Sequence, residues 1–260
     1  MKRTILTGTL VLATGFMCLM AQQPPAKGQA KGPAPKSQGE AQALNDLFQA
    51  ANSGNNPDAV ITASEALVTK YADSDFKEAA LLLEAQAYKQ KNDTDKATIY
   101  GERVLEINPK NFQITLMLGE ILAMKTREND LDKEEKLTKA DKYLNGTIED
   151  LKTAAKPNPQ IPDAQWEEAK KQIVAEAHND LGLVAITRKK YDVAVTEFKA
   201  AIDGDPQPTY SVRLASAYQQ GGKNEEATAI CDKLLADPQL NPQIATVAKQ
   251  VKAAAAAGKK

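Results

Sequence analysis

Short segments with the apolar spacing of α-helices recur along the chain and are separated by turns. In residues 175–207 the pattern predicts a helix that ends near Arg188, a turn at 188–192, and a second helix from about Tyr191 to Ile202. The letters DGDP at 203–206 then end this second helix, because Gly stops a helix and Pro cannot continue one. No stretch alternates apolar and polar positions long enough to require a sheet, so the pattern predicts an all-α fold.

The same arrangement of apolar and small residues returns at a fixed distance along the chain. Residues 175–207 and 208–240 match at a spacing of 33 residues, and further Leu-Gly and Ala-Tyr-Ala copies occur before them. Such internal repetition is typical of proteins built by stacking one supersecondary unit. The matched pairs are Leu181 and Leu214, Gly182 and Ala215, Ala194 and Ala227, and Phe198 and Cys231.

Gly182 stands inside a predicted helix, where glycine is destabilising by roughly 0.5–1 kcal/mol relative to alanine. Small residues recur at this position in the repeat and again at Ala194 on the second helix. Packed helices lie about 8–10 Å apart, at a distance set by the side chains at the contact. We therefore interpret Gly182 as a packing position at which the two helices of a pair approach closely.

These helix pairs resemble the tetratricopeptide repeat, a 34-residue helix–turn–helix unit with an aromatic residue, Leu-Gly, Tyr, Ala, Phe, Ala and Pro at fixed offsets. The resemblance extends over residues 41–241 and implies a right-handed α-solenoid of antiparallel helix pairs. His178 and Ala185 depart from the family pattern, which has an aromatic residue and a tyrosine there. The matching residues are Leu181, Gly182, Ala194, Phe198, Ala201 and Pro206, then Leu214, Tyr218 and Ala227, and earlier Tyr88, Ala97 and Pro109.

One repeat is longer than the others. The Leu-Gly pairs at 118–119 and 181–182 lie 63 residues apart, nearly twice the repeat length. We assign the excess to an elongated helix at about 130–155, a Pro-rich break, and an early start of the next helix at Pro162. The final segment, 242–256, is predicted to be a capping helix, which solenoids need for solubility. The predicted repeats are 41–74, 78–111, 112–155, 162–207 and 208–241.

Residues 1–21 have the pattern of a secretory signal. Lys2 and Arg3 precede an uncharged run at 4–21, and cleavage is expected after Ala21. The alternative is an uncleaved anchor in the inner membrane formed by residues 4–21, although Thr and Gly residues dilute the apolar run. A lipoprotein signal at Cys18 is disfavoured, because Met17 stands where a small residue belongs. The sequence therefore predicts an exported protein of the periplasm or cell envelope.

The segment 22–40 contains Pro, Gly, Gln, Ala and Lys but no aliphatic side chain larger than Ala, which predicts a disordered linker near the membrane. Removal of residues 1–21 changes the formal net charge from −1 to −3, since 31 basic and 34 acidic residues remain. That balance argues against a nucleic-acid partner, which needs a basic face. Cys231 is then the single cysteine, so no internal disulfide is expected.

The candidate chemical groups are few, and we predict no catalytic residues, no cofactor, no metal site and no enzymatic activity. His178 is the single histidine, and Cys231 is expected to pack as a small buried hydrophobe. Trp166 has two interpretations: it packs the long insert against the solenoid, or it is an exposed anchor for a partner. The sequence has no Gly-rich phosphate loop, no paired CxxC motif and no nucleophile elbow.

The resemblance implies that the first helices of the repeats line a groove that binds a protein or peptide segment. The implied function is a non-enzymatic interaction adaptor of the bacterial cell envelope. The alternatives are an assembly factor that acts by self-association and an adaptor anchored by its N-terminal helix. Asn179 and Arg213 suggest, but do not establish, a clamp for a terminal carboxylate; equally, several groove residues are candidates for core between repeats. The groove residues assigned by offset are Leu82, Gln86, Lys89, Leu116, Glu120, Ala123, Met124, Asn179, Leu183, Ile186, Val212, Ser216 and Gln219.

Overall fold

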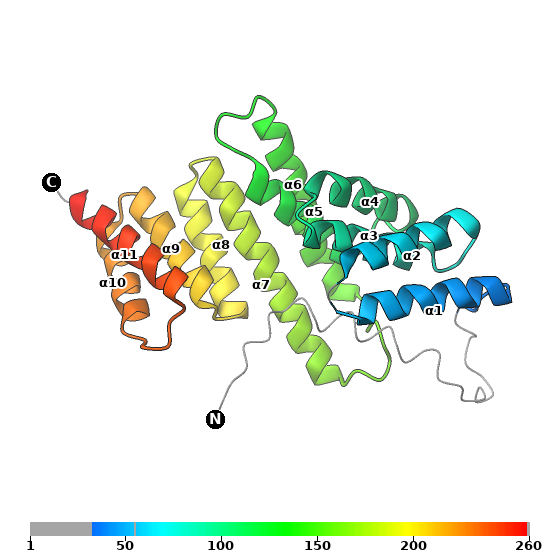
Figure 1. Cartoon of the computed structure of the whole chain (residues 1–260). Helices are drawn as coiled ribbons and strands as arrows, with labels where there is room; N and C mark the ends of the chain where they lie inside the picture. The colour runs from blue at the N-terminus through cyan, green and yellow to red at the C-terminus, as the bar shows by residue number, and fades with distance from the viewer. Residues whose placement is uncertain (1–32, 55, 259–260) are drawn as a thin grey trace. The chain divides into compact units, whose positions relative to one another are not determined.

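The computed structural model describes residues 33–54 and 56–258, and in this part of the chain it contains eleven α-helices and no strand (Figure 1). The predicted all-α class is therefore confirmed. The predicted signal at 1–21 and most of the predicted linker lie outside the described residues. The helices are α1 Gln38–Asn52, α2 Pro57–Lys70, α3 Lys77–Gln90, α4 Thr94–Ile107, α5 Phe112–Lys125, α6 Lys133–Thr153, α7 Asp163–Thr187, α8 Tyr191–Gly204, α9 Pro208–Gln220, α10 Asn224–Leu235 and α11 Pro242–Ala257.

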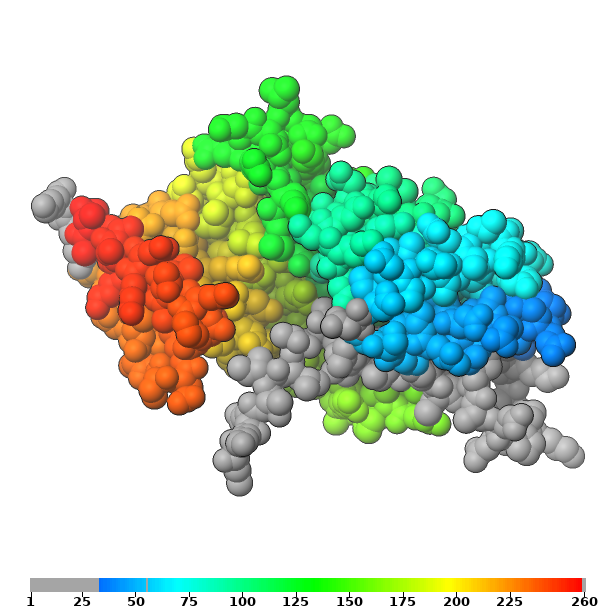
Figure 2. Space-filling model, in the orientation of Figure 1, coloured from blue at the N-terminus to red at the C-terminus, as the bar shows by residue number. Residues whose placement is uncertain are grey.

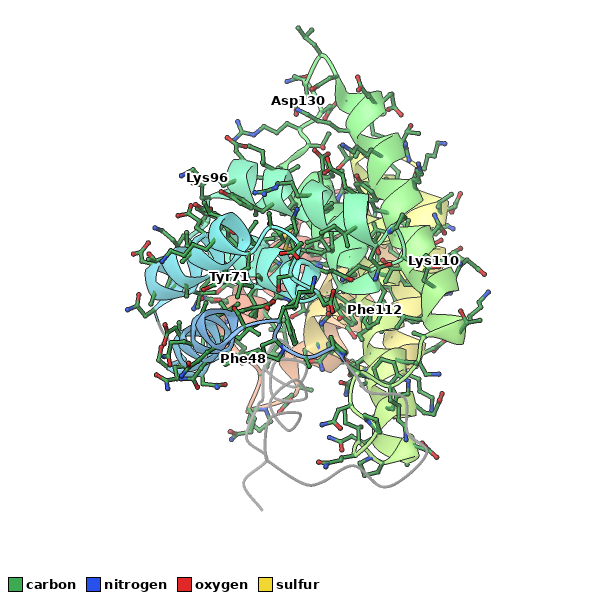
Figure 3. The ribbon with its side chains drawn as sticks, turned by 90° about the vertical axis from the view of Figure 1, so that its right-hand side faces the viewer. Phe48, Tyr71, Lys96, Lys110, Phe112 and Asp130 are labelled. Carbon is green, nitrogen blue, oxygen red and sulfur yellow. The ribbon has the colours of Figure 1, made fainter. Side chains whose placement is uncertain are left out.

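The described residues form two compact units, which we treat separately. Unit 1 comprises residues 33–114 and 155–163, and unit 2 comprises residues 115–154 and 164–258. In unit 1, α1 packs against α2, α2 against α3, and α3 against α4. The side chains of Phe48 on α1 and Tyr71 at the end of α2 add to its core (Figure 3). The buried members of that core are Leu44, Leu47, Leu67, Phe76 and Ala80.

Local capping determines where the helices of unit 1 begin. Ser37 caps α1, since its Oγ accepts a hydrogen bond from the Glu40 amide at 3.1 Å. The predicted linker at 22–40 therefore ends earlier than expected, because residues 38–40 are already helical and Glu40 is buried. Asp93 caps α4 in the same way, by accepting from the Lys96 amide at 3.1 Å.

The repeat at 78–111 is held together at its two ends by one carboxylate. Oε1 of Glu78, on the first turn of α3, accepts hydrogen bonds from Nδ2 of Asn108 and Nδ2 of Asn111, both at 2.8 Å. Both asparagines follow α4, so these bonds join the start of the first helix to the chain beyond the second. These bonds therefore hold α3 and α4 together as one helix pair.

The turn between the two helices of a pair has the same geometry in three places. Asn92, Lys189 and Gly222 follow α3, α7 and α9, and all three have a positive φ, of 59°, 58° and 78°. In each turn the next amide reaches back five residues to a carbonyl, with N···O distances of 3.0, 2.8 and 2.8 Å. This is the hydrogen-bond pattern of a helix that ends in a left-handed residue. The repeat is thus marked by backbone geometry as well as by packing residues.

Unit 2 begins with the elongated part of the solenoid. The sequence predicts a long helix at about 130–155 and an early start at Pro162; α6 has 21 residues and α7 has 25, the latter starting at Asp163. Arg188, directly after α7, holds α6 in place: its Nε lies 2.9 Å from Oε2 of Glu134 and its Nη1 lies 2.5 Å from Oδ2 of Asp141. The core of α5, α6 and α7 consists of Ala123, Leu137, Ala140, Leu144, Ala177, Leu181 and Val184.

Two glycines of unit 2 mark close helix contacts. A Cβ atom on Gly182 would lie 2.5 Å from Cε1 of Phe198, and one on Gly119 would lie 2.5 Å from Cδ2 of Leu144. The interpretation of Gly182 as a packing position agrees with this geometry. The end of α8 differs from the expected one: the helix ends at Gly204 rather than at Ile202, and a Cβ on Gly204 would lie 3.1 Å from that of Ala175. Gly204 is therefore the last helical residue, and its missing side chain permits a close approach to α7.

The helix α11 completes unit 2 by covering the last pair. It contacts both α9 and α10, and its inner residues Ala248, Val251 and Ala255 share one core with Ala227 and Cys231. Asn241 caps α11 through a hydrogen bond from the Gln243 amide at 2.8 Å, and Pro242 occupies its first turn. The segment predicted as a capping helix is thus helical and packs on α9 and α10.

Candidate protein-binding surfaces

The predicted groove residues of unit 1 all lie on α3. Gln86 is exposed, and Leu82 and Lys89 are half-buried. These three side chains follow one another at four- and three-residue steps, so they share one face of the helix. This part of the predicted surface is accessible to a partner.

On α5, at the start of unit 2, the predicted residues differ in exposure. Met124 is 61% exposed, and Leu116 and Glu120 are half-buried. Leu116 packs against the core formed with α6 and α7, and Ala123 is a buried member of that core. Met124 is therefore the apolar side chain of this helix most accessible to a partner, and Ala123 does not belong to the surface.

On α7, the prediction is wrong for Asn179, which is only 3% exposed. Its Nδ2 donates to Oδ1 of Asp180 at 3.0 Å, and its Oδ1 accepts from Nη1 of Arg213 on α9 at 2.7 Å. The two residues suggested for a carboxylate clamp thus bind each other and join α7 to α9. Leu183 and Ile186 are half-buried and pack against the neighbouring cores, so they contribute to both packing and surface.

On α9, Val212 is also misassigned, because it is buried in the core that α9 shares with α10 and α11. Ser216 and Gln219 are half-buried and remain at the surface. The Oγ of Ser216 accepts a hydrogen bond from Nε2 of Gln220 at 3.0 Å. The accessible part of the predicted face in unit 2 is therefore polar on α9 and apolar on α5.

Three single residues considered as candidates from the sequence take part in packing or in contacts between helices, namely His178, Cys231 and Trp166. Nδ1 of His178 lies 2.8 Å from Oε2 of Glu197, which links α7 to α8. Cys231 is buried, and burial raises the pKa of its thiol, so it packs as a small hydrophobe and not as a reactive thiolate. Trp166 is buried at 4% exposure, which excludes the interpretation of an exposed anchor.

The described residues contain neither a cluster of metal ligands nor a membrane-spanning helix. In residues 33–54 and 56–258, no three His, Cys, Asp or Glu side chains gather in a way that could hold a metal ion. No helix in this same part of the chain combines the length and apolar character needed to cross a membrane.

The sequence did not predict that unit 1 contains a buried glutamate beside a pair of tyrosines. Glu84 on α3 is 1% exposed, and burial raises the pKa of its carboxyl to about 7, an effect that the hydroxyl of Tyr100 opposes by donating a hydrogen bond. The Tyr100 ring stacks on that of Tyr88 with centroids 5.1 Å apart, and Nζ of Lys96 lies 5.0 Å from the Tyr88 centroid. A single glutamate in an otherwise apolar helix face would have been the available signal.

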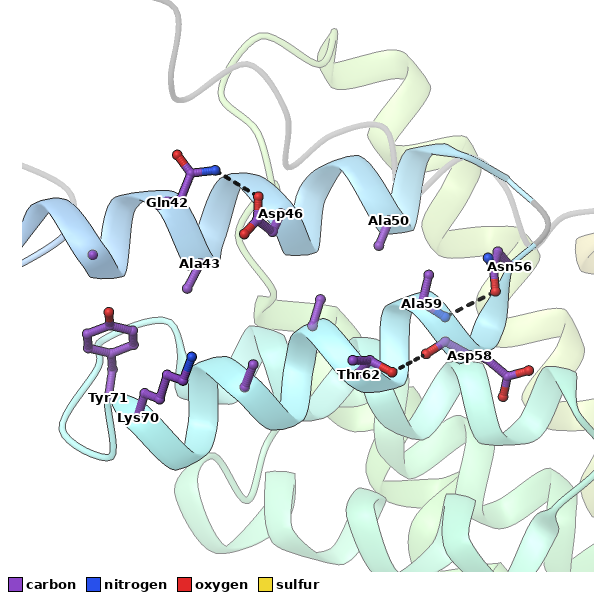
Figure 4. Close-up of a pocket in the computed structure, with 13 residues that line it drawn as sticks. Gln42, Ala43, Asp46, Ala50, Asn56, Asp58, Ala59, Thr62, Lys70 and Tyr71 are labelled. Atoms are coloured by element: carbon purple, nitrogen blue, oxygen red, sulfur yellow. Dashed lines mark hydrogen bonds between the residues drawn. The ribbon is translucent and has the colours of Figure 1, made fainter.

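The sequence also did not predict a groove that the structure contains in unit 1. It lies between α1 and α2, has a volume of about 690 Å³, and is formed by residues of these two helices and their ends. Figure 4 shows alanine side chains along both helices, with Asp46 on α1 and Asp58 at the start of α2. At the other end of the groove lie Lys70 and Tyr71. The surface is thus apolar at its floor and charged at its edges.

The comparisons with known proteins identify the repeat. The family model described as tetratricopeptide repeat matches residues 78–111. This is the segment whose two ends are joined by the hydrogen bond from Asn108 to Glu78. Residues 78–111 are therefore similar to a tetratricopeptide repeat. No curated protein is similar enough in sequence to match the chain.

Solved structures of tetratricopeptide-repeat proteins have a similar fold. The thermophilic repeat protein TTC0263 of Thermus thermophilus is 20% identical, with a TM-score of 0.50 over 82% of this chain and 98% of that chain. MamA of AMB-1 is also 20% identical, with a TM-score of 0.54 over 80% of this chain and 97% of that chain. At this level of identity the likeness concerns the fold, an all-α tetratricopeptide-repeat-like solenoid.

Proposed function

We propose that this protein is a non-enzymatic interaction scaffold of the bacterial cell envelope, which binds a protein or peptide segment on the first helices of its repeats. Proteins built from tetratricopeptide repeats generally mediate protein–protein interactions. The observation that carries the proposal is the accessible face in unit 2, where Met124 is 61% exposed beside half-buried Glu120. A flexible Met side chain adapts to varied apolar ligands. A face of this kind can bind a protein segment without any catalytic group.

The absence of enzymatic activity is part of this proposal. The single histidine contacts Glu197 at a helix–helix contact, and Cys231 is buried in a core. These groups hold helices together, which supports a binding role over a catalytic one.

The proposed location rests on the N-terminal sequence. The basic start and uncharged run of residues 1–21 support export followed by cleavage after Ala21. Mass spectrometry of the protein from its native host should detect a mature chain that begins at Gln22. A chain that retains residues 4–21 in the membrane fraction would favour the anchored alternative.

Site-specific photocrosslinking tests the binding face. A photoreactive amino acid at Met124 should form an adduct with a partner in intact cells. Val193 is the matched control, because it is an apolar residue on the second helix α8 with 48% exposure. Equal adduct formation at both positions, or none at Met124, would contradict the proposed face.

A further inference from the structure

The groove between α1 and α2 has the shape of a binding site for one more helix. Its floor consists of half-buried alanines that repeat at helical spacing along both elements. Alanine at a contact allows helix axes to approach to about 8 Å, the short end of the usual range. Figure 2 shows α1 and α2 at the surface of unit 1, in blue and cyan. The floor residues are Ala43, Ala50, Ala59, Ala63 and Ala66.

The outer face of α11 has complementary character. Its inner face is buried against α9 and α10, whereas its outer face is exposed and continues to the end of the helix. The side chains there are Thr or Ala except near the middle, where Lys249 and Gln250 lie. Figure 2 shows α11 at the surface of unit 2, in red. The residues of this outer face are Thr246, Lys249, Gln250, Ala253, Ala256 and Ala257.

The two surfaces agree in length. The groove is bounded by α1 with 15 residues and α2 with 14, and α11 has 16. At 1.5 Å per residue these helices are about 21–24 Å long. An α11 helix would therefore occupy the whole groove without extending far beyond either end.

The two surfaces also agree in charge. Within the chain, Lys252 of α11 already pairs with Asp232 and Asp58 of the groove already pairs with Lys91. The opposite charges that remain for a contact between the two surfaces are Lys249 on α11 and Asp46 in the groove. Asp46 is the ninth residue of α1 and Lys249 is the eighth of α11, so both lie near the middle of their helices. With the C-terminus of α11 at Lys70 and its N-terminus towards Asp58, the helix dipole would also be favourably placed.

We propose that α11 of a second copy of this chain binds in the α1–α2 groove, with Lys249 of that copy paired to Asp46. Such a contact joins two different surfaces, so it is heterologous and leads to open chains or closed rings of copies. The proposal is independent of the partner-binding residues assigned on α3, α5, α7 and α9, and its failure would leave that function intact. The contact is small and built on alanine, so we expect weak, concentration-dependent assembly.

Charge reversal of the pair tests the proposal. The mature chain is examined by sedimentation velocity at concentrations up to about 1 mM, which covers weak association. Wild type should form species larger than a monomer as concentration rises. Asp46→Lys and Lys249→Glu should each weaken association by about tenfold or more, because like charges would then face each other. The double variant restores an opposite pair and should associate as wild type does.

Mixing the two single variants gives a second readout. In the mixture, α11 of each variant meets a groove of opposite charge on the other variant, so the mixture should regain the concentration-dependent association that each variant alone has lost. Asp95→Lys on α4 and Lys233→Glu on α10 change charge equally at exposed positions outside both surfaces and should leave association unchanged. Circular dichroism checks that every variant is folded. A wild-type chain that stays monomeric, or association unaffected by either reversal, would overturn the proposal.

Discussion

At the residue scale, the close contact of Gly182 with Phe198 shows how one missing side chain fixes a helix pair. A Cβ at Gly182 would lie 2.5 Å from the Phe198 ring, whereas a Cβ at Gly146 on α6 would have nothing within 4 Å. The two glycines have similar helical backbones but opposite surroundings. The effect of each glycine on the stability of the protein therefore depends on its neighbours and not on helix propensity alone.

Gly182→Ala should destabilise the protein by about 1–3 kcal/mol, because the added methyl group overpacks the contact with Phe198. Gly146→Ala is the matched control and should stabilise by about 0.5–1 kcal/mol through helix propensity. Urea denaturation followed by circular dichroism measures both. A stabilising Gly182→Ala variant would mean that the ring has room to move.

Glu84 should make the stability of the protein depend on pH. Its folded-state pKa of about 7 lies above the ordinary value of 4.5, so between these values the folded state binds the extra proton. Stability should therefore be highest below about pH 4.5, as far as this group is concerned, and should fall as pH rises to about 7.

Thermal unfolding of wild type and Glu84→Gln, from pH 5 to pH 8, isolates that effect. The neutral amide cannot ionise, so the variant should lose part of the decline seen in wild type. Glu65→Gln on α2 is a suitable comparison, since Glu65 is exposed and only adds to the raised pKa of Glu84. Parallel curves for wild type and Glu84→Gln would show that Glu84 is charged throughout.

At the element scale, the turn after a first helix is the most regular feature of the repeat. Asn92, Lys189 and Gly222 occupy the same left-handed position in three turns, although one is a lysine, which adopts this conformation at a cost. Sequence spacing predicts these turns, because the flanking helices end and begin at recognisable residues. It does not predict that Lys189 would be left-handed, since the packed helices on either side impose that conformation.

Gly222→Ala should destabilise the protein by about 1 kcal/mol, because alanine is strained at a φ of 78° even with open space around the Cβ. Lys189→Gly should act in the opposite direction, since it relieves the same strain and loses only an exposed ion pair with Glu128. Urea denaturation of both variants tests this pair of expectations. Equal effects of the same sign would contradict them.

At the scale of the whole molecule, stability is expected to be local. Each repeat contacts mainly its neighbours, so a perturbation in a solenoid extends only over adjacent helices. In unit 2 the helices α8, α9, α10 and α11 are linked by such neighbouring contacts, and in unit 1 the helices α1 to α4 are linked likewise. The two compact units should therefore respond differently to one substitution.

Hydrogen exchange of Gly182→Ala measures this directly. Amides of α7 and α8 should exchange faster than in wild type, because the substitution weakens their contact. Amides of α2 and α3 in unit 1 should keep their wild-type rates. A uniform acceleration over both units would instead indicate a single cooperative structure.

The sequence by itself determined that the chain folds into paired helices, the order of those pairs, and the close packing at Gly182. These depend on local information: the 3.6-residue spacing of apolar residues, capping residues, and small residues such as Gly182 at one point of each repeat. Only the tertiary structure decided which helix faces are covered. Asn179 and Val212 share the expected face with Met124, yet neighbouring helices bury the first two and leave Met124 exposed. The alanine groove of α1 and α2 arises for the same reason, because exposure is a property of the assembled helices and not of any one of them.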